Sequence, residues 1–528
     1  MRLIEQSDYL YKTKPYEHQA KAFMLSRDET EYGYLMEMGT GKTKTTIDVA
    51  SWLWSQGRIN FFLISAPNDV HRNWITREIP PHMPDWVPRR TCIWSANMKA
   101  ADWEDFWSLF DPDFIGLRIL SVNHDAFSAG ERFWKTASKD KTKPRFGTAI
   151  TMIMNSFKVL FAVDESSKIK TPGARRAQRH CTIGKKALYR RILTGTLGGP
   201  LEAYMQFNFL NPEILGGHPA MNYFSYKHRY ADWQTERNHK TGRNYQICTG
   251  YKRIDELRAK IASKSFRVLK KDCLDLPEKV YKRRPCQMEK EQKRLYEKCK
   301  TQAILELRKE DTTVQNVLVK YLRLQQIMGG WLPSPEPDMP AEPLFESPEQ
   351  NPRIKAMMDV IEENGEQRII IWARFRAEIE AITDILNSVY GDGAAVSFYG
   401  GTSKDEREEN IYRFQGSRPI MDPDTNMKTG DDVCPEEKRA RFFVANAHSG
   451  GYGLTLTAAT CVIYYSNDFS LEARLQSEDR CHRIGQTSKV LYVDIEIPAT
   501  LDGRILGALR GKKNLADTVV GDDPSDWF

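Results

Sequence analysis

The stretch YLMEMGTGKTKTT, residues 34–46, decides how the rest of the chain is interpreted. Small residues run into a lysine, a threonine and a helical pattern, so backbone N–H groups and a helix N-terminus can face a triphosphate. Lys42 would meet the β and γ phosphates, and Thr43 would hold Mg²⁺. The strict pattern G-x-x-x-x-G-K-[ST] fails, because Met36 stands at its first position. A flexible turn with a solvated lysine is the alternative interpretation. The predicted ATP-binding residues of this loop are Gly39, Thr40, Gly41, Lys42 and Thr43.

Length and composition describe a globular protein of several compact units. With roughly 150 residues per domain as a guide, the 528 residues should form about two to four units. Hydrophobic residues make up 41% and charged residues 28%, and the net charge of +7 permits a polyanionic partner. No apolar run approaches the roughly 18 residues of a membrane helix, and the N-terminus lacks a secretory signal. The nine cysteines form no C-x-x-C pair, so we expect an intracellular protein without a membrane span, zinc site or disulfide framework.

An acidic pair follows the apolar run VLFAV, residues 159–163. Asp164 and Glu165 come directly after this predicted strand, and parallel sheets present ligand groups at the carboxyl ends of their strands. Asp164 can order Mg²⁺, and Glu165 can orient and deprotonate the attacking water. Such a pair is also a common helix N-cap. The phosphate loop upstream favours the catalytic interpretation.

Three further groups of polar residues support the same hypothesis. Gln19 lies one turn into a predicted helix, where its amide can read the edge of adenine. The Thr-Gly-Thr turn at residues 194–196 can sense the γ-phosphate and pass its state to a neighbouring domain. Arg480 and Arg483 fall on one helix face, with Gln476 one turn earlier, and could act as arginine fingers across a cleft. Taken alone, each group would favour the plainer interpretation, a solvated helix face for Gln19 and the arginines and an ordinary loop for residues 194–196; the neighbouring motifs favour the functional one.

Strands and helices alternate at residues 34–193 and again at residues 368–497, which predicts an α/β protein with two parallel-sheet domains. Aromatic and basic residues interleave at residues 225–245, a pattern typical both of nucleic-acid backbone binding and of a solvated helix. We expect the polar insert at residues 415–441 to be a loop. The predicted division is an N-terminal ATP-binding lobe (1–212), a helical and basic insertion (213–275), a helical protrusion with a proline-rich connection (276–350), a C-terminal lobe (351–510) and a tail (511–528).

The ordered series of motifs resembles superfamily 2 nucleic-acid motors, and within them the Swi/Snf-type DNA translocases. RCHRIGQ, FNFLNPEILG and YLRLQQI favour this branch over DEAD-box RNA helicases. The resemblance spans roughly residues 9–500. The stretches that carry it are EHQ, EMGTGKT, APNDVHRNW, DESSKIK, LTGTLGG, LPEK, RIIIWARF, SFYGGTSKDER, SGGYGLTL and QSEDRCHRIGQ.

This resemblance implies two RecA-like lobes with ATP between them, a DNA duplex lying across both, and helical protrusions from each lobe. It implies the roles given above for Gln19, the phosphate loop, the acidic pair and the two arginines as catalytic fingers. It also implies that Gly453 approaches the nucleotide. The residues that it assigns to coupling between lobes are Thr194, Gly195, Thr196 and Gln476. The residues that it assigns to the DNA backbone are Pro67, Asn123, Lys168, Lys170 and Arg374.

Four positions depart from the family pattern. Met36 stands where the family usually has Asp, and Thr455 stands where Asn is common. Ser167 replaces the histidine of Asp-Glu-x-His, and Leu197 replaces a proline, which leaves the coupling of these segments open. None of the four removes a phosphate-binding, metal-binding or water-activating group, so we expect active ATP hydrolysis.

The resulting prediction is an ATP- and Mg²⁺-dependent DNA translocase that tracks the backbone of double-stranded or branched DNA. Backbone tracking predicts little sequence specificity and a steep dependence on salt. The alternatives are a true helicase, a fork-reversal or branch-migration motor, and a nucleotide-gated DNA-binding scaffold with weak turnover. A small-molecule kinase is disfavoured by the second α/β domain. We expect a monomer, cytoplasmic and nucleoid-associated in a bacterium or its virus, or nuclear in a eukaryote, with a protein cargo that the sequence does not identify.

Overall fold

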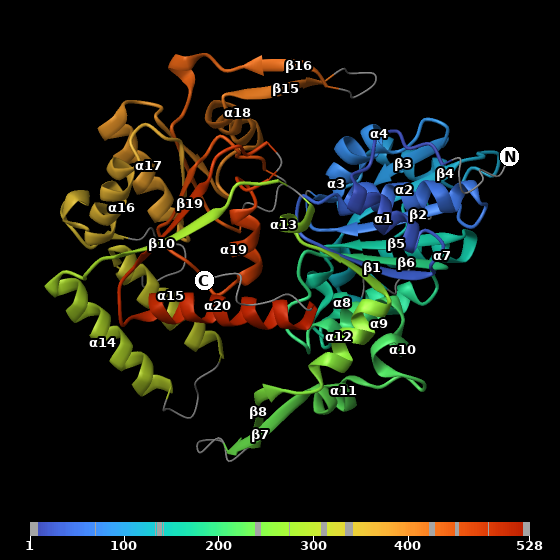
Figure 1. Ribbon diagram of the computed structural model, residues 1–528, viewed down its shortest axis with the longest axis horizontal. Helices are drawn as coiled ribbons and strands as arrows, with labels where there is room; N and C mark the ends of the chain where they lie inside the picture. The colour runs from blue at the N-terminus through green and yellow to red at the C-terminus, as the bar shows by residue number, and fades with distance from the viewer. Residues whose placement is uncertain are drawn as a thin grey trace.

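The computed structural model describes residues 9–68, 70–131, 134, 140, 142–237, 244–273, 275–307, 314–332, 342–421, 428–448, 454–483 and 485–520. Its backbone forms two lobes, each built on a parallel sheet covered by helices (Figure 1). This confirms the predicted fold class, α/β with two RecA-like lobes and helical protrusions. Among the residues that the structure describes, none of the helices combines the length and the apolar character needed to cross a membrane.

The sheet of the first lobe has seven strands in the order β3-β4-β2-β5-β6-β1-β9. Its central strands are apolar on both faces, as expected for a parallel sheet covered by helices on both sides. In register, Leu63 of β2 lies opposite Leu120 of β4 on one side and Phe161 of β5 on the other. The strands are β1(Glu31–Met36), β2(Phe61–Ala66), β3(Arg89–Ile93), β4(Leu117–Asn123), β5(Val159–Asp164), β6(Tyr189–Leu193) and β9(Ser265–Val268).

Two hydrophobic cores lie on opposite faces of this sheet. Because side chains alternate along a strand, Phe62 and Ile64 join one core, whereas Phe61 and Leu63 join the other. The first core includes α1(Glu17–Ser26), α2(Lys42–Ser55) and α4(Ile79–His82), with α3(Val70–Asn73) alongside. The second includes α5(Ala100–Ser108), α7(Phe146–Ser156), α8(Arg175–Gly184), α9(Ala203–Leu210), α10(Pro212–Gly216), α11(Tyr223–Tyr230) and α12(Ile254–Ser263).

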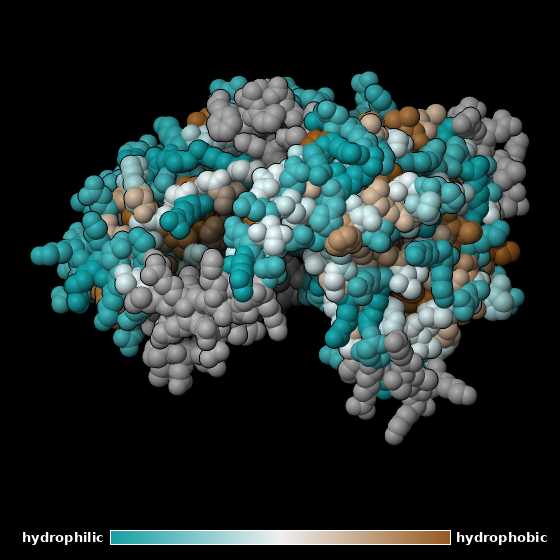
Figure 2. All heavy atoms as spheres, turned by 90° about the horizontal axis from the view of Figure 1, so that it is seen from below, coloured by the Kyte–Doolittle hydropathy of each residue, from teal (hydrophilic) through white to brown (hydrophobic). Residues whose placement is uncertain are grey.

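A hairpin projects from the first lobe within the insertion predicted at residues 213–275. Its strands, β7(Ala231–Arg237) and β8(Asn244–Tyr251), pair in antiparallel fashion and extend from α11 (Figure 1). Hydrophilic residues predominate on the face of the molecule that is seen from below (Figure 2).

After the hairpin the chain returns to the first sheet, where β9 pairs with β1 before α13(Lys270–Cys273). The predicted helical insertion is therefore helical only in part, and it supplies the edge strand of the sheet.

The sheet of the second lobe has six parallel strands in the order β10-β19-β18-β13-β17-β14. Its strands are β10(Lys279–Pro285), β13(Ile369–Trp372), β14(Ala395–Phe398), β17(Phe442–Ala445), β18(Cys461–Tyr464) and β19(Val490–Glu496). The helices of this part of the chain are α14(Lys290–Leu307), α15(Val314–Gly329), α16(Pro352–Glu363), α17(Arg376–Tyr390), α18(Lys404–Gln415), α19(Leu471–Glu478) and α20(Leu501–Val520). Two residue pairs form the short ladder of β11(Trp331–Leu332) and β12(Glu342–Pro343).

The structure differs from two sequence-based expectations in this lobe. Strand β10 belongs to the second sheet although it lies in the range 276–350, for which we expected a protrusion and a connection. Its residues KVYKRRP are mostly exposed at a sheet edge, so the strand lacks the apolar signature of a buried one. The polar insert at residues 415–441 contains the hairpin of β15(Ser417–Met421) and β16(Lys428–Val433) rather than only a loop. Helix α20 runs through residue 520 into the predicted tail, whose residues 521–528 lie outside the described ranges.

Candidate active site

A cleft of about 850 Å³ lies between the two lobes and brings together all five predicted catalytic residues, Lys42, Asp164, Glu165, Arg480 and Arg483. The first lobe contributes the phosphate loop and the acidic pair, and the second contributes α19 and the two arginines. The phosphate loop follows β1, and the acidic pair lies at the end of β5. Because both strands belong to one parallel sheet, their carboxyl ends lie at the same edge, which brings the two segments together. The predicted site residues that line the cleft are Gln19, Gly39, Gly41, Lys42, Thr43, Pro67, Asp164, Glu165, Lys168, Gln476, Arg480 and Arg483.

The phosphate loop is shaped by glycine and fastened by α1. Gly41 has a φ of 91°, and a Cβ atom there would lie 2.1 Å from Gln19 Nε2, so only glycine fits. The Gln19 amide donates to the carbonyl oxygen of Thr40 at 3.1 Å, and His18 Nε2 donates to the same oxygen at 2.7 Å. Gln19 thus lies beside the loop and lines the cleft, and its reading of adenine stays a prediction.

Lys42 begins α2 with its side chain turned back over the loop. Its Nζ donates to the carbonyl oxygens of Met36 at 2.8 Å and Glu37 at 3.2 Å. Thr40 is buried, and its hydroxyl donates to the Glu37 carbonyl at 2.7 Å. The loop therefore holds its own backbone in a tight turn, with the ammonium group at its centre and the N-terminus of α2 open to the cleft.

Asp164 and Glu165 form a pair of carboxyl groups, of which Asp164 is buried and Glu165 partly buried at the cleft. Trp74 Nε1 donates to one oxygen of Asp164 at 2.9 Å, and the Glu165 amide donates to the other at 3.0 Å. Burial raises the pKa of Asp164, while the Trp74 hydrogen bond and the Lys42 charge oppose that rise. Burial likewise raises the pKa of Glu165 to about 7, with Lys42 again opposing it. A carboxyl group with a pKa near neutrality is suited to accept a proton from water.

Glu165 also has an uncommon backbone conformation. Its φ of 46° and ψ of 57° lie in the left-handed region, which is costly for a residue with a side chain. The strand ends here and the chain turns at once into the short 3-10 helix η3(Ser166–Ile169). This sharp turn leaves the carboxyl group lining the cleft.

The donor groups fit a magnesium ion. Thr43 offers a hydroxyl and Asp164 a carboxylate, and both line the cleft next to Lys42. Mg²⁺ is commonly held by one or two protein oxygens together with water and substrate phosphates rather than by a closed protein cage. The described residues contain no cluster of three or more His, Cys, Asp or Glu side chains that could hold a metal alone.

The arginine pair of the second lobe faces the acids of the first. Burial lowers the pKa of Arg480 to about 10 and the charge of Arg483 adds to this, whereas Asp479 and Glu165 act in the opposite direction. Burial also lowers the pKa of Arg483, which the charges of Asp479 and Glu78 oppose. Arg480 Nε is buried and has no hydrogen-bond partner among the described residues. The guanidinium group therefore retains donor capacity for a ligand in the cleft.

The residues assigned to coupling lie in two places, the Thr-Gly-Thr turn beside the phosphate loop and Gln476 at the cleft that the arginines line. Thr194 Oγ1 donates to the Thr196 carbonyl at 2.6 Å, which closes the Thr-Gly-Thr turn on itself. A Cβ atom at Gly195 would lie 3.6 Å from the Met38 amide nitrogen, so this turn borders the phosphate loop. Gln476 lines the cleft, and its amide is 3.3 Å from Glu472 Oε1.

The five residues assigned to DNA do not form one cluster. Pro67 and Lys168 line the nucleotide cleft, and Lys168 forms an ion pair with Glu472 at 2.7 Å. Lys170 pairs with Glu202 at 3.0 Å. Asn123 caps the short helix that follows β4 by accepting from the Ala126 amide at 2.8 Å.

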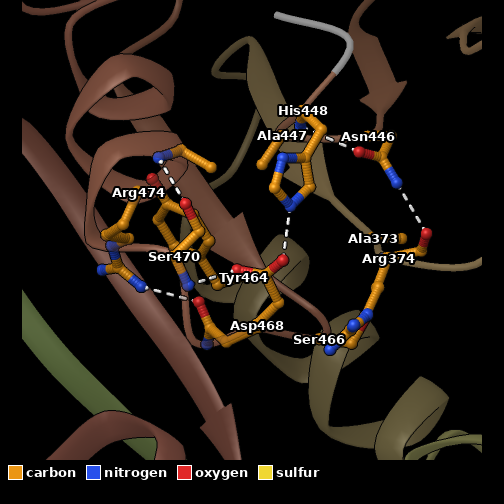
Figure 3. Close-up of a pocket in the computed structure, with 12 residues that line it drawn as sticks. Ala373, Arg374, Asn446, Ala447, His448, Tyr464, Ser466, Asp468, Ser470 and Arg474 are labelled. Carbon is orange, nitrogen blue, oxygen red and sulfur yellow. Dashed lines mark hydrogen bonds and ion pairs between the residues drawn. The ribbon is translucent and has the colours of Figure 1, made fainter. Parts of the chain in front are cut away.

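Arg374 lies in the second lobe, at a small separate cavity of about 20 Å³ (Figure 3). Its guanidinium donates to Gln325 Oε1 at 2.5 Å, and its carbonyl accepts from Asn446 at 2.6 Å. In the same view the ring of His448 points to the carboxylate of Asp468. The DNA roles remain predictions, and Gly453, expected at the nucleotide, lies outside the described residues.

Several residues of the site were not predicted from the sequence. Trp74 belongs to the APNDVHRNW stretch, but nothing in that stretch indicates that its indole reaches Asp164. Glu78 lines the cleft beside Arg77, one helical turn further on. Lys270 follows β9 and contacts Asp479 of the second lobe. Only the motif stretch around Trp74 carried a signal that could have pointed to a site residue.

Comparisons with known proteins agree with this geometry. The SNF2-related domain family matches residues 16–330, and the helicase conserved C-terminal domain family matches residues 352–485. The chain is 24% identical to the CHD3-type chromatin-remodeling factor CHR7 of Arabidopsis thaliana over 92% of this chain and 35% of that protein. It is 23% identical to the DNA annealing helicase and endonuclease ZRANB3 of Bos taurus over 96% of this chain and 40% of that protein.

Other similarities are shorter or weaker. Chromatin-remodeling ATPase INO80 of Cryptococcus neoformans is 36% identical over 22% of this chain and 6% of that protein. The Sulfolobus solfataricus SWI2/SNF2 ATPase core in complex with dsDNA is 21% identical, with a TM-score of 0.38, and the match covers 99% of this chain and 96% of that one. The chain spans less than half the length of each of these curated relatives. Because the SNF2-related family matches more than half of its residues, the chain belongs to the SNF2 family of helicase-like ATPases.

Proposed function

We propose that the protein is an ATP-dependent DNA translocase, in which ATP hydrolysis between the lobes moves them along a DNA backbone. One observation carries the proposal: Lys42 and Glu165 of the first lobe and Arg480 and Arg483 of the second line a single cleft. A site divided between two lobes changes its shape when its nucleotide is bound, cleaved and released. That dependence is what a motor requires.

Each group has a defined task in hydrolysis. The Lys42 ammonium and the N-terminus of α2 bind the phosphates. Glu165, with its raised pKa, holds the attacking water and accepts its proton. Arg480 and Arg483 supply positive charge where the transition state gains negative charge. Thr43 and Asp164 would hold Mg²⁺, which when bound neutralises phosphate charge.

Two ion pairs connect the lobes at the cleft, and both can form only while the lobes are close together. Lys168 of the first lobe contacts Glu472 of α19 at 2.7 Å, and Lys270 contacts Asp479 at 2.7 Å. A γ-phosphate held by Lys42 and by the arginines would add a third connection. Its loss on hydrolysis removes that connection and allows the lobes to separate, so each turnover can produce one opening and one closing.

The family membership and the net charge of +7 support DNA as the polymer along which the lobes move. The Sulfolobus neighbour is described as being in complex with dsDNA. A second candidate, a motor that anneals strands or remodels branches, is favoured by the similarity to ZRANB3, a DNA annealing helicase, across 96% of this chain. Both candidates place the protein in a compartment that contains DNA.

The test measures ATP turnover with no nucleic acid, and with single strands, duplexes, forks and four-way junctions. A translocase shows strong stimulation by duplex and displaces a third strand from a triplex, whereas a branch remodeller responds most to forks and junctions. Stimulation falls steeply with added salt, because backbone contacts release counterions.

Two variants make this test specific. Lys42→Ala and Glu165→Gln abolish turnover, and Lys186→Ala, at an exposed position away from the cleft, leaves it unchanged. DNA binding with negligible turnover in the unmodified protein would overturn the proposal in favour of a nucleotide-gated scaffold. Turnover that ignores every nucleic acid would also contradict it.

A further inference from the structure

A buried glutamine joins the acidic pair of the active site to the Thr-Gly-Thr loop. Ser166 directly follows Glu165, and its hydroxyl donates to Gln206 Oε1 at 2.7 Å. The Gln206 amide nitrogen donates in turn to the carbonyl oxygens of Leu197 at 2.9 Å and Glu202 at 3.1 Å. Leu197 is the residue after Thr196. One side chain on α9 therefore spans two active-site segments that are far apart in the sequence.

The hydrogen bonds define the orientation of this amide. Leu197 and Glu202 present carbonyl oxygens, which only accept, so the nitrogen of Gln206 must face them. Its oxygen then faces Ser166, whose hydroxyl can donate. Both Ser166 and Gln206 are fully buried at 0% exposure. In such surroundings each bond is costly to lose, and the bridge transmits displacement better than a solvated contact.

The loop at the far end of the bridge is connected to strand β1, which leads into the phosphate loop, and it borders the phosphate loop itself. Arg267 of β9 donates to the Gly195 carbonyl at 3.1 Å and to the Leu35 carbonyl at 2.9 Å. Gly195 borders Met38 closely enough that a Cβ atom there would lie 3.6 Å from the Met38 nitrogen. A displacement of the Thr-Gly-Thr turn would therefore displace its neighbours in strand β1 and in the phosphate loop.

A second connection runs in parallel at the surface. Lys170, near the end of η3, pairs with Glu202 Oε1 at 3.0 Å, and Glu202 Oε2 accepts from the Gly199 amide at 3.3 Å. Lys170 and Glu202 are 38% and 40% exposed, so water and salt weaken their attraction. The buried amide of Gln206 is accordingly the stronger of the two connections.

We propose that Gln206 is a positioning residue that couples the acidic pair to the Thr-Gly-Thr loop, so that DNA binding accelerates ATP hydrolysis. The proposal rests on the proposed function, because it concerns how DNA stimulates the site. It also answers how this chain couples these segments although Ser167 stands where the family has histidine. The Ser167 hydroxyl is buried and has no hydrogen-bond partner among the residues that the structure describes.

The experiment compares Gln206→Met, Ser166→Ala and their double variant with Ser167→Ala as the matched control. Methionine keeps the length of glutamine without its hydrogen bonds, and Ser167→Ala removes a neighbouring hydroxyl that bonds to no described residue. The measurements are turnover without DNA, turnover with saturating duplex, the KM for ATP, and the melting temperature.

In Gln206→Met and Ser166→Ala the ratio of DNA-stimulated to basal turnover should fall at least about fivefold, the lower end of typical coupling between linked sites. Basal turnover and KM should stay within about twofold, and the double variant should match Gln206→Met because the two residues act as one unit. Ser167→Ala should keep the full ratio.

Three results would overturn the inference. The first is an unchanged ratio of DNA-stimulated to basal turnover in folded single variants, and the second is effects that add in the double variant. Either would show that Gln206 does not couple the acidic pair to the Thr-Gly-Thr loop. If Gln206→Met fails to fold, Ser166→Ala decides alone, since it deletes one hydroxyl. Absence of stimulation in the unmodified protein would instead reject the proposed function, together with this inference.

Discussion

The ammonium group of Lys270 lies 2.7 Å from the carboxylate of Asp479, which joins the first lobe to the segment that carries Arg480. The same ammonium donates to the His482 carbonyl at 2.9 Å. On the other side, the Lys270 amide donates to the side chain of Glu37 in the phosphate loop at 2.6 Å. One residue of the linker thus contacts both halves of the active site, which gives the first prediction.

Lys270→Met and Asp479→Asn should each lower kcat by roughly 10- to 100-fold, the cost of misplacing catalytic groups by about an ångström. Asp479→Asn leaves the buried ammonium group of Lys270 without its carboxylate, and Lys270→Met leaves Asp479 with only the more distant Lys279 at 3.7 Å. The double variant should therefore be less impaired than either single one. Steady-state kinetics of the three variants measures this. Lys271→Met, at the exposed neighbouring position, is the control and should retain full turnover.

Arg480→Ala should lower kcat by about 10³-fold, as expected for loss of an arginine finger. The KM for ATP should change little, because the arginine acts mainly on charge that develops in the transition state. Arg480→Lys should not restore the rate, since an ammonium group lacks the planar fork of donors. Single-turnover and steady-state assays check both statements, and Arg376→Ala, exposed on α17, serves as the control. A raised KM with unchanged kcat would contradict the assigned role.

Trp74→Phe should lower the affinity of the site for Mg²⁺ without abolishing binding, so that turnover requires a higher Mg²⁺ concentration. The indole N–H holds one oxygen of Asp164 and opposes the rise of its pKa, so its loss leaves the carboxyl group less oriented and more readily protonated. Loss of such a supporting bond costs about tenfold or more in metal affinity. Turnover as a function of Mg²⁺ concentration measures the shift. Trp372→Phe removes a buried indole whose Nε1 has no partner among the described residues, and it should leave that curve in place.

The stability of the first lobe should depend on pH through Asp48. Burial raises the pKa of this carboxyl from 3.8 to about 6, although Lys44 at 2.7 Å and Tyr9 oppose the rise. The folded state therefore binds this proton more tightly than the unfolded state. The contribution is fully present below about pH 4 and is lost as the pH rises through about 6.

The magnitude of this effect is about 3 kcal/mol, from 1.36 kcal/mol per pKa unit. The difference in melting temperature between the unmodified protein and Asp48→Asn, followed from pH 4 to pH 7, isolates it from the other carboxyl groups. A difference that stays constant across this range would show that Asp48 keeps its ordinary pKa.

Much of the fold followed from local patterns. The run at residues 159–163 is apolar enough to predict a buried parallel strand, and the structure confirms it as β5(Val159–Asp164). The residues of the candidate site could also be predicted from the sequence. The glycines, lysine, acids and arginines occur in short motifs, and the order of these motifs along the chain is informative. The edge strand β10 was missed, since exposed edges carry little apolar signal.

The residues that connect the site were hidden for a different reason. Gln206 is one of two side-chain amides in the largely apolar helix α9, and Lys270 is one of two adjacent lysines in the linker. The sequence does not show whether the polar group of either residue is exposed to solvent or bonded to another part of the protein. Their partners, Ser166 and Asp479, lie too far along the chain for any local periodicity to reveal the pairing.

The sequence by itself determined the chemistry of this protein, because phosphate binding, water activation and charge stabilisation each require particular side chains at short spacing. Only the tertiary structure decided which of those groups meet, that Trp74 bonds to Asp164 and Gln206 to Ser166, and how the lobes contact each other across the cleft. The physical reason is that hydrogen bonds and ion pairs depend on distances of a few ångströms, which are set by the packing of whole sheets rather than by neighbours in the chain.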